Sequence, residues 1–350
     1  MDTKKYDVLT LGAGAAGLAA ARRLAEAGMR VAVVEARGRI GGRIFTEHVP
    51  LGNSTQFPVE LGAEFVHGLP PALWSLIGEA KLAAYELEGG RLCFDDGLLK
   101  PCSEEQHDAT AVLDEMTHWL ANQPSDVDAT FADYLRLEGI EAPTAERAAA
   151  YVESFNAADR NVISVAALAQ QQRAEVTLVF QSKFWNEPGR PRSRLSPENG
   201  SHDFSFLFAH KEVLPVWWTP MPDAAPVITA WTAGPKALAL EARTGENSAA
   251  LLNECLTALA TIFGVSVRAL EGALVSWHTH DWQADPYARG AYSYAPAGAR
   301  GASEKMTEPV EGTLFFAGEH TDTQGHWGTV HGALGSGTRA ATQLLAVGHP

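Results

Sequence analysis

Cysteine is scarce in this sequence, and long apolar runs are missing. Cys93, Cys102 and Cys255 are its only cysteines, and their spacing matches neither a disulfide framework nor a zinc motif. We therefore expect unpaired thiols, no metal site and a reducing, cytoplasmic location. No apolar run approaches the ~20 residues of a membrane span, and no signal peptide precedes the first expected strand, so we expect no membrane association.

Basic residues are also fewer than acidic ones. Lys and Arg number 27 against 42 Asp and Glu, which gives a net charge of −15. This balance argues against a nucleic-acid-binding surface. It would favour cationic ligands, although solubility alone also explains it. The 350 residues are enough for two domains, and an apolar content of 46% is ordinary for a globular protein.

The first forty residues have the pattern of a dinucleotide-binding unit. An apolar strand at 8–11 runs into Gly12-Ala13-Gly14-Ala15-Ala16-Gly17, which opens a helix, and a second strand at 31–34 ends on Glu35. Gly12 allows the tight turn, Gly14 leaves room for a pyrophosphate, and Gly17 lets helix and strand pack closely. The helix N-terminus favours phosphate, and Glu35 is placed to accept a hydrogen bond from a ribose hydroxyl. A turn that serves packing alone is the alternative.

Four further motifs follow in order. Ala36-Arg37-Gly38-Arg39-Ile40-Gly41-Gly42-Arg43 places adjacent glycines between arginines, which indicates backbone close to an anion. The others are Gly62–Gly68, an apolar strand at 314–316 that runs into Ala317-Gly318-Glu319-His320-Thr321, and Gly328–Gly337, which opens a last helix through Leu345. Between them we expect helices at 70–82, 104–122, 130–137, 143–157, 162–175 and 246–263, a hairpin at 85–100, and strands at 176–180, 204–210, 213–218, 227–232 and 273–279.

Together these motifs resemble the flavin-dependent amine oxidase family, which includes monoamine oxidases, polyamine oxidases, L-amino-acid oxidases and histone lysine demethylases. The resemblance is close over about 5–70 and 275–346. It implies an α/β fold with a Rossmann-like FAD-binding domain, a doubly wound parallel sheet built from 1–70 plus 311–350. An α+β substrate domain, 71–310, is inserted into it. The demethylase branch is disfavoured because no chromatin-binding domain or coiled-coil insertion is present.

The resemblance also implies site residues. FAD binding falls to Gly12, Gly14, Ala16, Gly17, Glu35, Ala36, Arg37, Gly41, Gly42, Arg43, Gly62, Ala63, Glu64, Gly318, Glu319, Thr329 and Val330. Beside the flavin, Tyr292 forms one wall of an aromatic cage, Thr329 stands where the other wall often has a tyrosine, and Trp282 packs near the ring. His67 lies at the cavity mouth. Tyr292 and Trp282 could instead be ordinary core aromatics, and His67 a structural histidine.

The implied reaction is oxidation of a small primary or secondary amine, polyamines included. The neutral amine gives a hydride to the flavin, the imine is hydrolysed, and oxygen restores the flavin and yields hydrogen peroxide. Many family members attach the flavin to a cysteine, and Ala291 holds that position here. The resemblance therefore implies non-covalent FAD.

One segment departs from the family. The helix expected at 162–175 meets the strand at 176–180 without a turn residue, where family members carry a much longer stretch. Its loss would expose sheet edges, open the adenine side of the site and give a reason to form a homodimer.

The family lysine that holds a water against the flavin falls at about Glu175, and Lys183 is out of register. The alternative function is therefore a shortened, non-catalytic relative that acts as an FAD-binding or scaffold protein. An NAD-dependent reductase is disfavoured because such an enzyme does not need the double glycine between arginines at 39–43.

Overall fold

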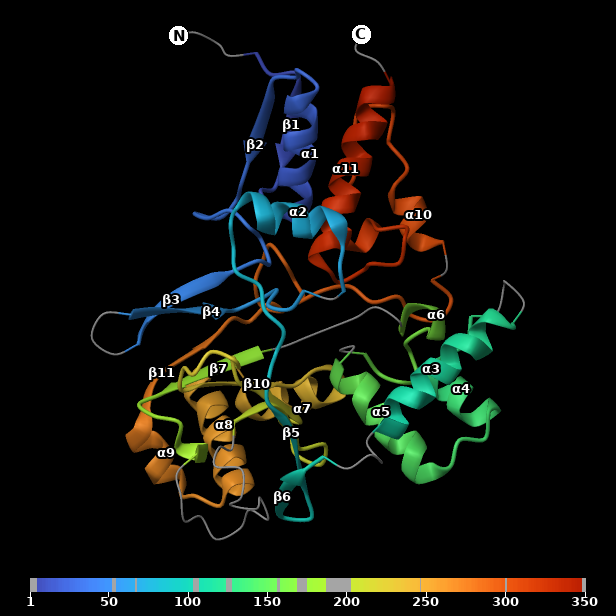
Figure 1. The fold of residues 1–350 in the computed structure, drawn as a ribbon. Helices are drawn as coiled ribbons and strands as arrows, with labels where there is room; N and C mark the ends of the chain where they lie inside the picture. Colours follow the sequence, from blue (N-terminus) through green and yellow to red (C-terminus); the bar gives the residue numbers. More distant parts are fainter. Residues whose placement is uncertain are drawn as a thin grey trace.

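The computed structural model describes residues 5–51, 55–66, 68–102, 107–123, 128–155, 158–168, 175–186, 203–245, 247–299 and 301–347. The two ends of the chain form one half of the molecule, and the middle of the chain forms the other (Figure 1). A two-stranded parallel sheet lies in the first half, and a seven-stranded mixed sheet lies in the second.

The predicted strand–turn–helix–strand unit is confirmed. β1 (Val8–Leu11) and β2 (Val31–Val34) pair in parallel, and α1 (Ala15–Glu26) connects them. A Cβ on Gly17 would lie 2.0 Å from the carbonyl oxygen of Gly12, so only glycine lets the helix leave the strand at this angle.

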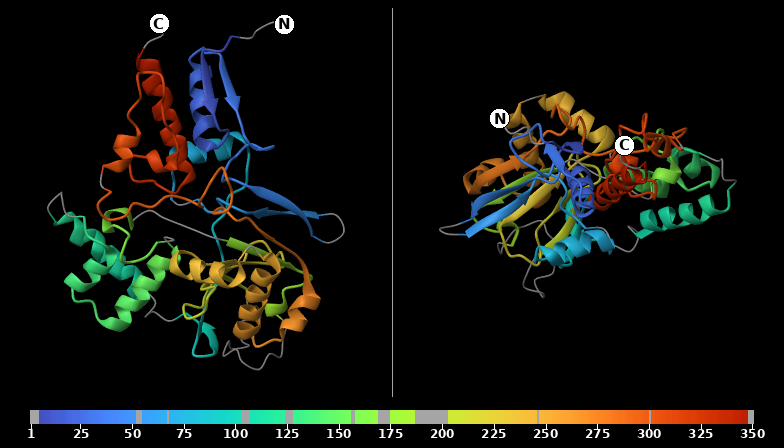
Figure 2. Two further views of the ribbon diagram at one scale, coloured as in Figure 1. Left: turned by 180° about the vertical axis from the view of Figure 1, so that it is seen from behind. Right: turned by 90° about the horizontal axis from the view of Figure 1, so that it is seen from above.

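The last helix, α11 (Val330–Val347), lies beside α1 in both views of Figure 2. Gly337 sits at their contact, because a Cβ there would be 2.1 Å from the carbonyl oxygen of Ala16. Ala20, Leu24 and Ala341 are buried between them. α2 (Pro71–Glu79) also contacts α11, and α10 (Ala302–Met306) packs on the short turn η4 (Glu319–Thr321). The chain ends are thereby joined into one half.

The strand predicted at 314–316 is wrong. Leu314 forms only an isolated bridge with Val310, and Leu314 and Phe316 are 56% and 43% exposed. Within the described residues, one face of the small parallel sheet is also bare, since Leu9 and Leu11 are 58% and 77% exposed. A strand forms only where a neighbour pairs with it, and here none is present in the described part of the chain. Since only β1 and β2 pair in this sheet, its two outer edges are also open in the described part of the chain.

A hairpin links the halves. β3 (Thr46–Leu51) and β4 (Thr55–Glu60) pair antiparallel, and Val59 and Leu61 pack against Val179 and Val227 of the large sheet. The chain then returns to the first half through 62–66.

The large sheet has the order β11-β7-β10-β9-β8-β5-β6. Its strands are β5 (Gly90–Asp95), β6 (Leu98–Pro101), β7 (Glu175–Phe180), β8 (Phe204–Phe208), β9 (Val216–Trp218), β10 (Val227–Trp231) and β11 (Leu274–Thr279). One face is covered by α7 (Gly234–Thr244), α8 (Ser248–Phe263) and α9 (Val267–Ala273). The opposite face carries Trp218 and Trp231, packed with Phe65 from the segment after β4. The strands agree with the predicted positions, whereas α7 and α9 were not predicted.

A separate helical group has its own core. α3 (His107–Ala121), α4 (Phe131–Leu137), α5 (Ala142–Phe155) and α6 (Val165–Leu168) pack around Phe131, Tyr134 and Val152. Of the helix predicted at 162–175, the structure shows α6, and 169–174 lie outside the described residues.

The expectation of unpaired cysteines is wrong. Cys93 and Cys102 form a disulfide across the β5–β6 hairpin. The backbone N–H of Cys102 donates to the carbonyl of Arg91, so Cys102 lies diagonal to Cys93 on the neighbouring strand. That pairing depends on the hairpin register, which spacing alone did not reveal. Cys255 is free and buried.

No single described helix is long and apolar enough to cross a membrane. The bent pair α8 and α9 passes that test together by length and composition only, and both helices contribute to the buried core against the large sheet.

Candidate functional site

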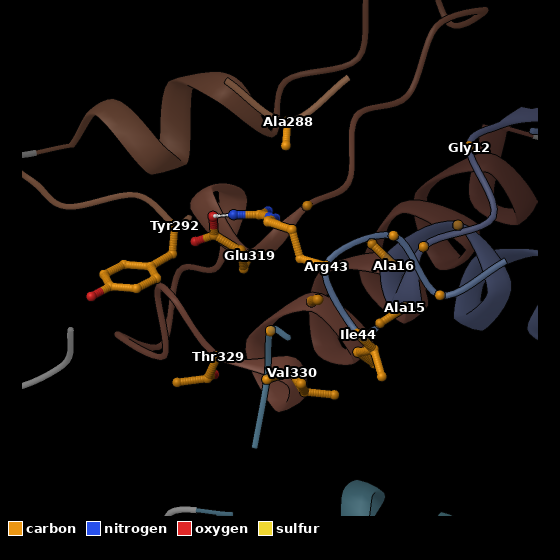
Figure 3. Close-up of a pocket in the computed structure, with 18 of the residues that line it drawn as sticks. Gly12, Ala15, Ala16, Arg43, Ile44, Ala288, Tyr292, Glu319, Thr329 and Val330 are labelled. Carbon is orange, nitrogen blue, oxygen red and sulfur yellow. Dashed lines mark hydrogen bonds and ion pairs between the residues drawn. The ribbon is translucent and has the colours of Figure 1, made fainter. Parts of the chain in front are cut away.

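A cavity of about 600 Å³ is lined by residues of the first half, by 61–66 after β4 and by residues between 282 and 292. This is within the range of small-molecule and cofactor sites. Figure 3 shows the lining residues that come from the start of the chain, from Arg43 and Ile44, from 288–292 and from the start of α11. The cavity brings together every cofactor residue predicted from the sequence, together with Trp282, Tyr292 and Thr329. His67 lies outside the described residues.

The glycine-rich turn leaves bare backbone facing the cavity. Gly14 is the N-cap of α1 and provides no side-chain cap, so the helix N-terminus keeps N–H groups available to an anion. Gly14 and Gly41 form a parallel bridge, and a Cβ on Gly42 would lie 3.3 Å from the Cα of Gly14. Gly12 has a φ of +97°, which favours glycine. These features fit the pyrophosphate of FAD.

Glu35 closes the end of β2. Its carboxylate accepts the backbone N–H of Ala13 at 2.7 Å and that of Arg37 at 2.8 Å. The N–H groups of Arg37 and Ala13 hold the pKa of Glu35 below its ordinary value. The charged carboxylate still has acceptor capacity for a ribose hydroxyl.

Arg37 has a partner that the sequence analysis did not foresee. Its guanidinium pairs with Asp285 and lies 5.2 Å from the ring centre of Tyr287. Burial alone would raise the pKa of Asp285, but the Tyr287 N–H, His280 and Arg37 outweigh it and the pKa is lowered. Arg37 therefore ties 285–287 to the end of β2.

Arg43 and Glu319 form a hydrogen-bonded node, drawn with a dashed line in Figure 3, in which Glu319 is buried and Arg43 is half-buried. Arg43 donates to Glu319 at 2.9 Å and to the carbonyl of Ala291 at 3.0 Å. Glu319 also accepts from the hydroxyl of Ser293 at 2.5 Å and the N–H of Gly328 at 2.7 Å. Burial raises the pKa of Glu319, but Arg43 and these donors outweigh it, so the pKa is lowered. The node joins the double-glycine loop, the Tyr292 segment and the start of α11.

Trp282 is held in the cavity wall by one hydrogen bond and one ring contact. Its indole N–H donates to the carbonyl of Leu61 at 2.8 Å, and its ring centre lies 4.1 Å from that of His280. A Cβ on Gly62 would lie 3.4 Å from Trp282 and 2.0 Å from the carbonyl oxygen of Arg43. Gly62 therefore lets the tryptophan and the double-glycine loop come together.

Tyr292 and Thr329 project toward the same side of the cavity (Figure 3). The Thr329 hydroxyl accepts from the N–H of Gly332 at 3.0 Å and donates to the carbonyl of His326 at 2.7 Å. It therefore caps the N-terminus of α11 as well as lining the cavity. Tyr292 follows Ala291, which also lines the cavity.

Several lining residues were not predicted. Phe65, Tyr287, Ala288 and His331 line the cavity. Phe65 and His331 lie within motifs already singled out, whereas Tyr287 and Ala288 lie between Trp282 and Tyr292. Lys183 does not line it and instead pairs with Asp203 at 2.8 Å. The backbone of Glu175 pairs with Trp231 at the start of β7. No group of three or more His, Cys, Asp or Glu in the described ranges is arranged to hold a metal ion.

Comparisons with known proteins identify the family of the chain. The family model of flavin-containing amine oxidoreductases matches residues 15–174 and 171–345. The two matched segments meet where the sequence analysis places the missing stretch. A possible lysine-specific histone demethylase 1 of Drosophila melanogaster is 32% identical over 182 residues. Polyamine oxidase 2 of Arabidopsis thaliana is 29% identical over 197 residues. Each match covers 49% of this chain, but only 18% and 39% of the two relatives.

Solved structures show the same fold. Wild-type putrescine oxidase bound to putrescine superposes with a TM-score of 0.75 at 19% identity, over 97% of this chain and 99% of that one. Cyclohexylamine oxidase from Brevibacterium oxydans superposes with a TM-score of 0.75 at 18% identity, over 98% of this chain. The α/β fold predicted from the motifs is thus confirmed. By the family match over nearly its whole length, the chain belongs to the flavin-containing amine oxidoreductases.

Proposed function

We propose that this protein binds FAD non-covalently and oxidises a small primary or secondary amine, with oxygen as the final electron acceptor. The observation that carries the proposal is the single cavity that collects the phosphate-binding turn, Glu35, the Arg43–Glu319 node, Trp282 and Tyr292. FAD, when bound, supplies the two-electron acceptor for the C–N bond.

The residues of this chain would hold and orient the reactants. The open N-terminus of α1 and Gly41–Gly42 would bind the pyrophosphate, and Glu35 would accept from a ribose hydroxyl. Tyr292 and Trp282 would form the aromatic walls that exclude water and favour an uncharged amine. Ala291 has no thiol for covalent attachment.

The visible spectrum of the purified, desalted protein tests cofactor binding. Flavin bands in near-stoichiometric amount are expected, and precipitation with acid should release the flavin into the supernatant. Anaerobic addition of an amine should then bleach the bands, whereas an alcohol with the same carbon skeleton should not. Colour that no amine or amino acid of a broad panel bleaches would contradict the enzymatic part.

A second function is favoured by one observation. The bare face of the small parallel sheet includes Leu11, which lines the cavity and is 77% exposed. Parallel sheets are normally covered on both faces. A shortened relative that binds FAD weakly and acts as a scaffold fits this exposure. Absence of flavin even after incubation with excess FAD would favour that function, and light scattering on the same preparation checks the expected homodimer.

A further inference from the structure

Glu64 differs from the other carboxylates of the cavity. Glu35, Glu64 and Glu319 line it. Glu319 pairs with Arg43, and Glu35 accepts two backbone N–H groups at the end of β2. The donor that the structure gives Glu64 is the indole of Trp218, 3.1 Å from both carboxylate oxygens. Within the described residues, no cation forms an ion pair with it.

Trp218 holds Glu64 without neutralising it. Trp218 is 1% exposed on β9, and its ring centre lies 5.4 Å from that of Phe65 and 5.6 Å from that of Trp231. An indole N–H is a neutral donor, so the carboxylate keeps its charge and its remaining acceptor sites. Because the tryptophan is locked in an aromatic cluster, the carboxylate is fixed on the side of the cavity that faces the large sheet.

The negative charge of Glu64 acts on two neighbouring groups, Glu60 and Tyr85. Glu60, on β4, is in the same stretch of chain, and burial followed by the charge of Glu64 raises its pKa. Burial, Asp223 and Glu64 likewise raise the pKa of Tyr85. This part of the cavity wall therefore favours a positive charge, and the adjacent Phe65 ring adds a face that a cation can contact.

We infer that Glu64 is a specificity-determining residue that binds a second, non-reacting cationic group of the amine substrate. The inference rests on the proposed function. A fixed carboxylate stabilises an ammonium and disfavours the neutral amine that must react. Glu64 therefore suits a nitrogen that stays protonated while another nitrogen of the same molecule is oxidised. Glu64 is expected among the FAD-binding residues, and its contact with Trp218 of the large sheet points to this additional role.

The test compares an α,ω-diamine with the n-alkyl monoamine of equal chain length on FAD-loaded protein. Glu64→Gln keeps an oxygen for Trp218 and removes the charge. Glu241→Gln, at an exposed position of α7, is the control with the same change in net charge. Hydrogen bonds to charged groups predict that kcat/KM for the diamine falls about 10- to 100-fold in Glu64→Gln. The ratio of the diamine value to the monoamine value should fall by a similar factor, because the monoamine has no second nitrogen to contact Glu64.

Calorimetric binding of the diamine separates this inference from the proposed function. One outcome is that wild type binds the diamine, Glu64→Gln binds it much more weakly, and neither protein oxidises an amine. That outcome would contradict the oxidase function but support the role of Glu64. Equal losses for diamine and monoamine would show a structural role and overturn the inference. Unchanged diamine affinity in Glu64→Gln, or no diamine binding by wild type, would overturn it too.

Discussion

Glycine is required at several cavity positions, Gly17 and Gly62 among them, because neighbouring carbonyl oxygens occupy the space of a methyl group. A Cβ on Gly17 would lie 2.0 Å from the oxygen of Gly12, and one on Gly62 would lie 2.0 Å from the oxygen of Arg43. Neither neighbour is a flexible side chain, so the backbone itself must move. The phosphate-binding turn and the Trp282 wall therefore depend on the absence of a side chain at Gly17 and Gly62.

Gly17→Ala should destabilise the protein by about 1–3 kcal/mol, the usual cost of overpacking. It should also lower flavin content, because the turn that faces the pyrophosphate shifts. Gly38→Ala is the matched control, since a Cβ there meets nothing within 4 Å. Chemical denaturation and the flavin-to-protein absorbance ratio measure both effects. Equal behaviour of the two variants would show that the turn adapts without cost.

Glu319 should make stability depend on pH. Its folded pKa is below the ordinary glutamate value of 4.5, so its charged form stabilises the fold above about that pH. This stabilisation is lost as the pH falls through the folded pKa. Glu319→Gln removes the charge of a buried side chain and, because Arg43 keeps contact with solvent, should cost about 1–3 kcal/mol near pH 7.

The stability difference between wild type and Glu319→Gln should therefore shrink as the pH falls below about 4.5. Glu35 and Asp285, whose pKa values are also lowered, remain in both proteins, so their contributions cancel in the difference. Urea denaturation at a series of pH values measures it. A difference that stays constant with pH would mean that Glu319 does not act through its charge.

At the scale of elements, the contact between α1 and α11 joins the two ends of the chain. Both helices begin at the cavity, with Gly14 as the N-cap of α1 and Thr329 capping α11. Ala16 and Gly337 pack so closely that a side chain at 337 cannot be placed without separating the helices. Their packing therefore fixes the distance between the phosphate-binding turn and the Thr329 wall.

Gly337→Ala and Gly335→Ala should have opposite effects. A Cβ at 337 would lie 2.1 Å from the oxygen of Ala16, whereas one at 335 meets only the Asp322 carboxylate at 3.7 Å. The first change should destabilise the protein and reduce flavin retention. The second should stabilise α11 by about 0.5–1 kcal/mol, because alanine favours helices. Thermal unfolding measures both, and a stabilising Gly337→Ala would contradict the close packing.

The predictable elements are those whose signals are local. The strand–turn–helix unit, the double glycine of 41–42 and the last helix follow from short motifs, and the structure contains all of them. The strand at 314–316 failed because strand formation depends on a neighbour that the motif does not contain. The Arg37–Asp285 pair joins residues 248 positions apart, and the Cys93–Cys102 disulfide depends on hairpin register. Neither is visible in local sequence.

At the scale of the whole molecule, the cavity is the place where distant segments meet. Its walls come from both ends of the chain, from the segment after β4 and from the stretch around Trp282 and Tyr292. The ADP portion of FAD would contact mainly the glycine-rich turn and Glu35. The isoalloxazine ring would contact the segments after β4 and around Tyr292. Bound FAD should therefore hold the two halves together, whereas ADP should act on the first half alone.

FAD should raise the melting temperature of flavin-free protein, because a ligand at 100 times its dissociation constant stabilises the folded state by about 2.7 kcal/mol. For a chain of this size, that corresponds to a shift of roughly 4 °C. ADP at the same concentration should raise the melting temperature less, because the adenine side of the cavity is open. Leu11 and Val34, at that side, are 77% and 52% exposed. Differential scanning fluorimetry with each ligand compares the two. An equal shift from ADP would mean that the walls around Trp282 and Tyr292 do not bind the ring, which would leave nucleotide binding as the activity that the cavity supports.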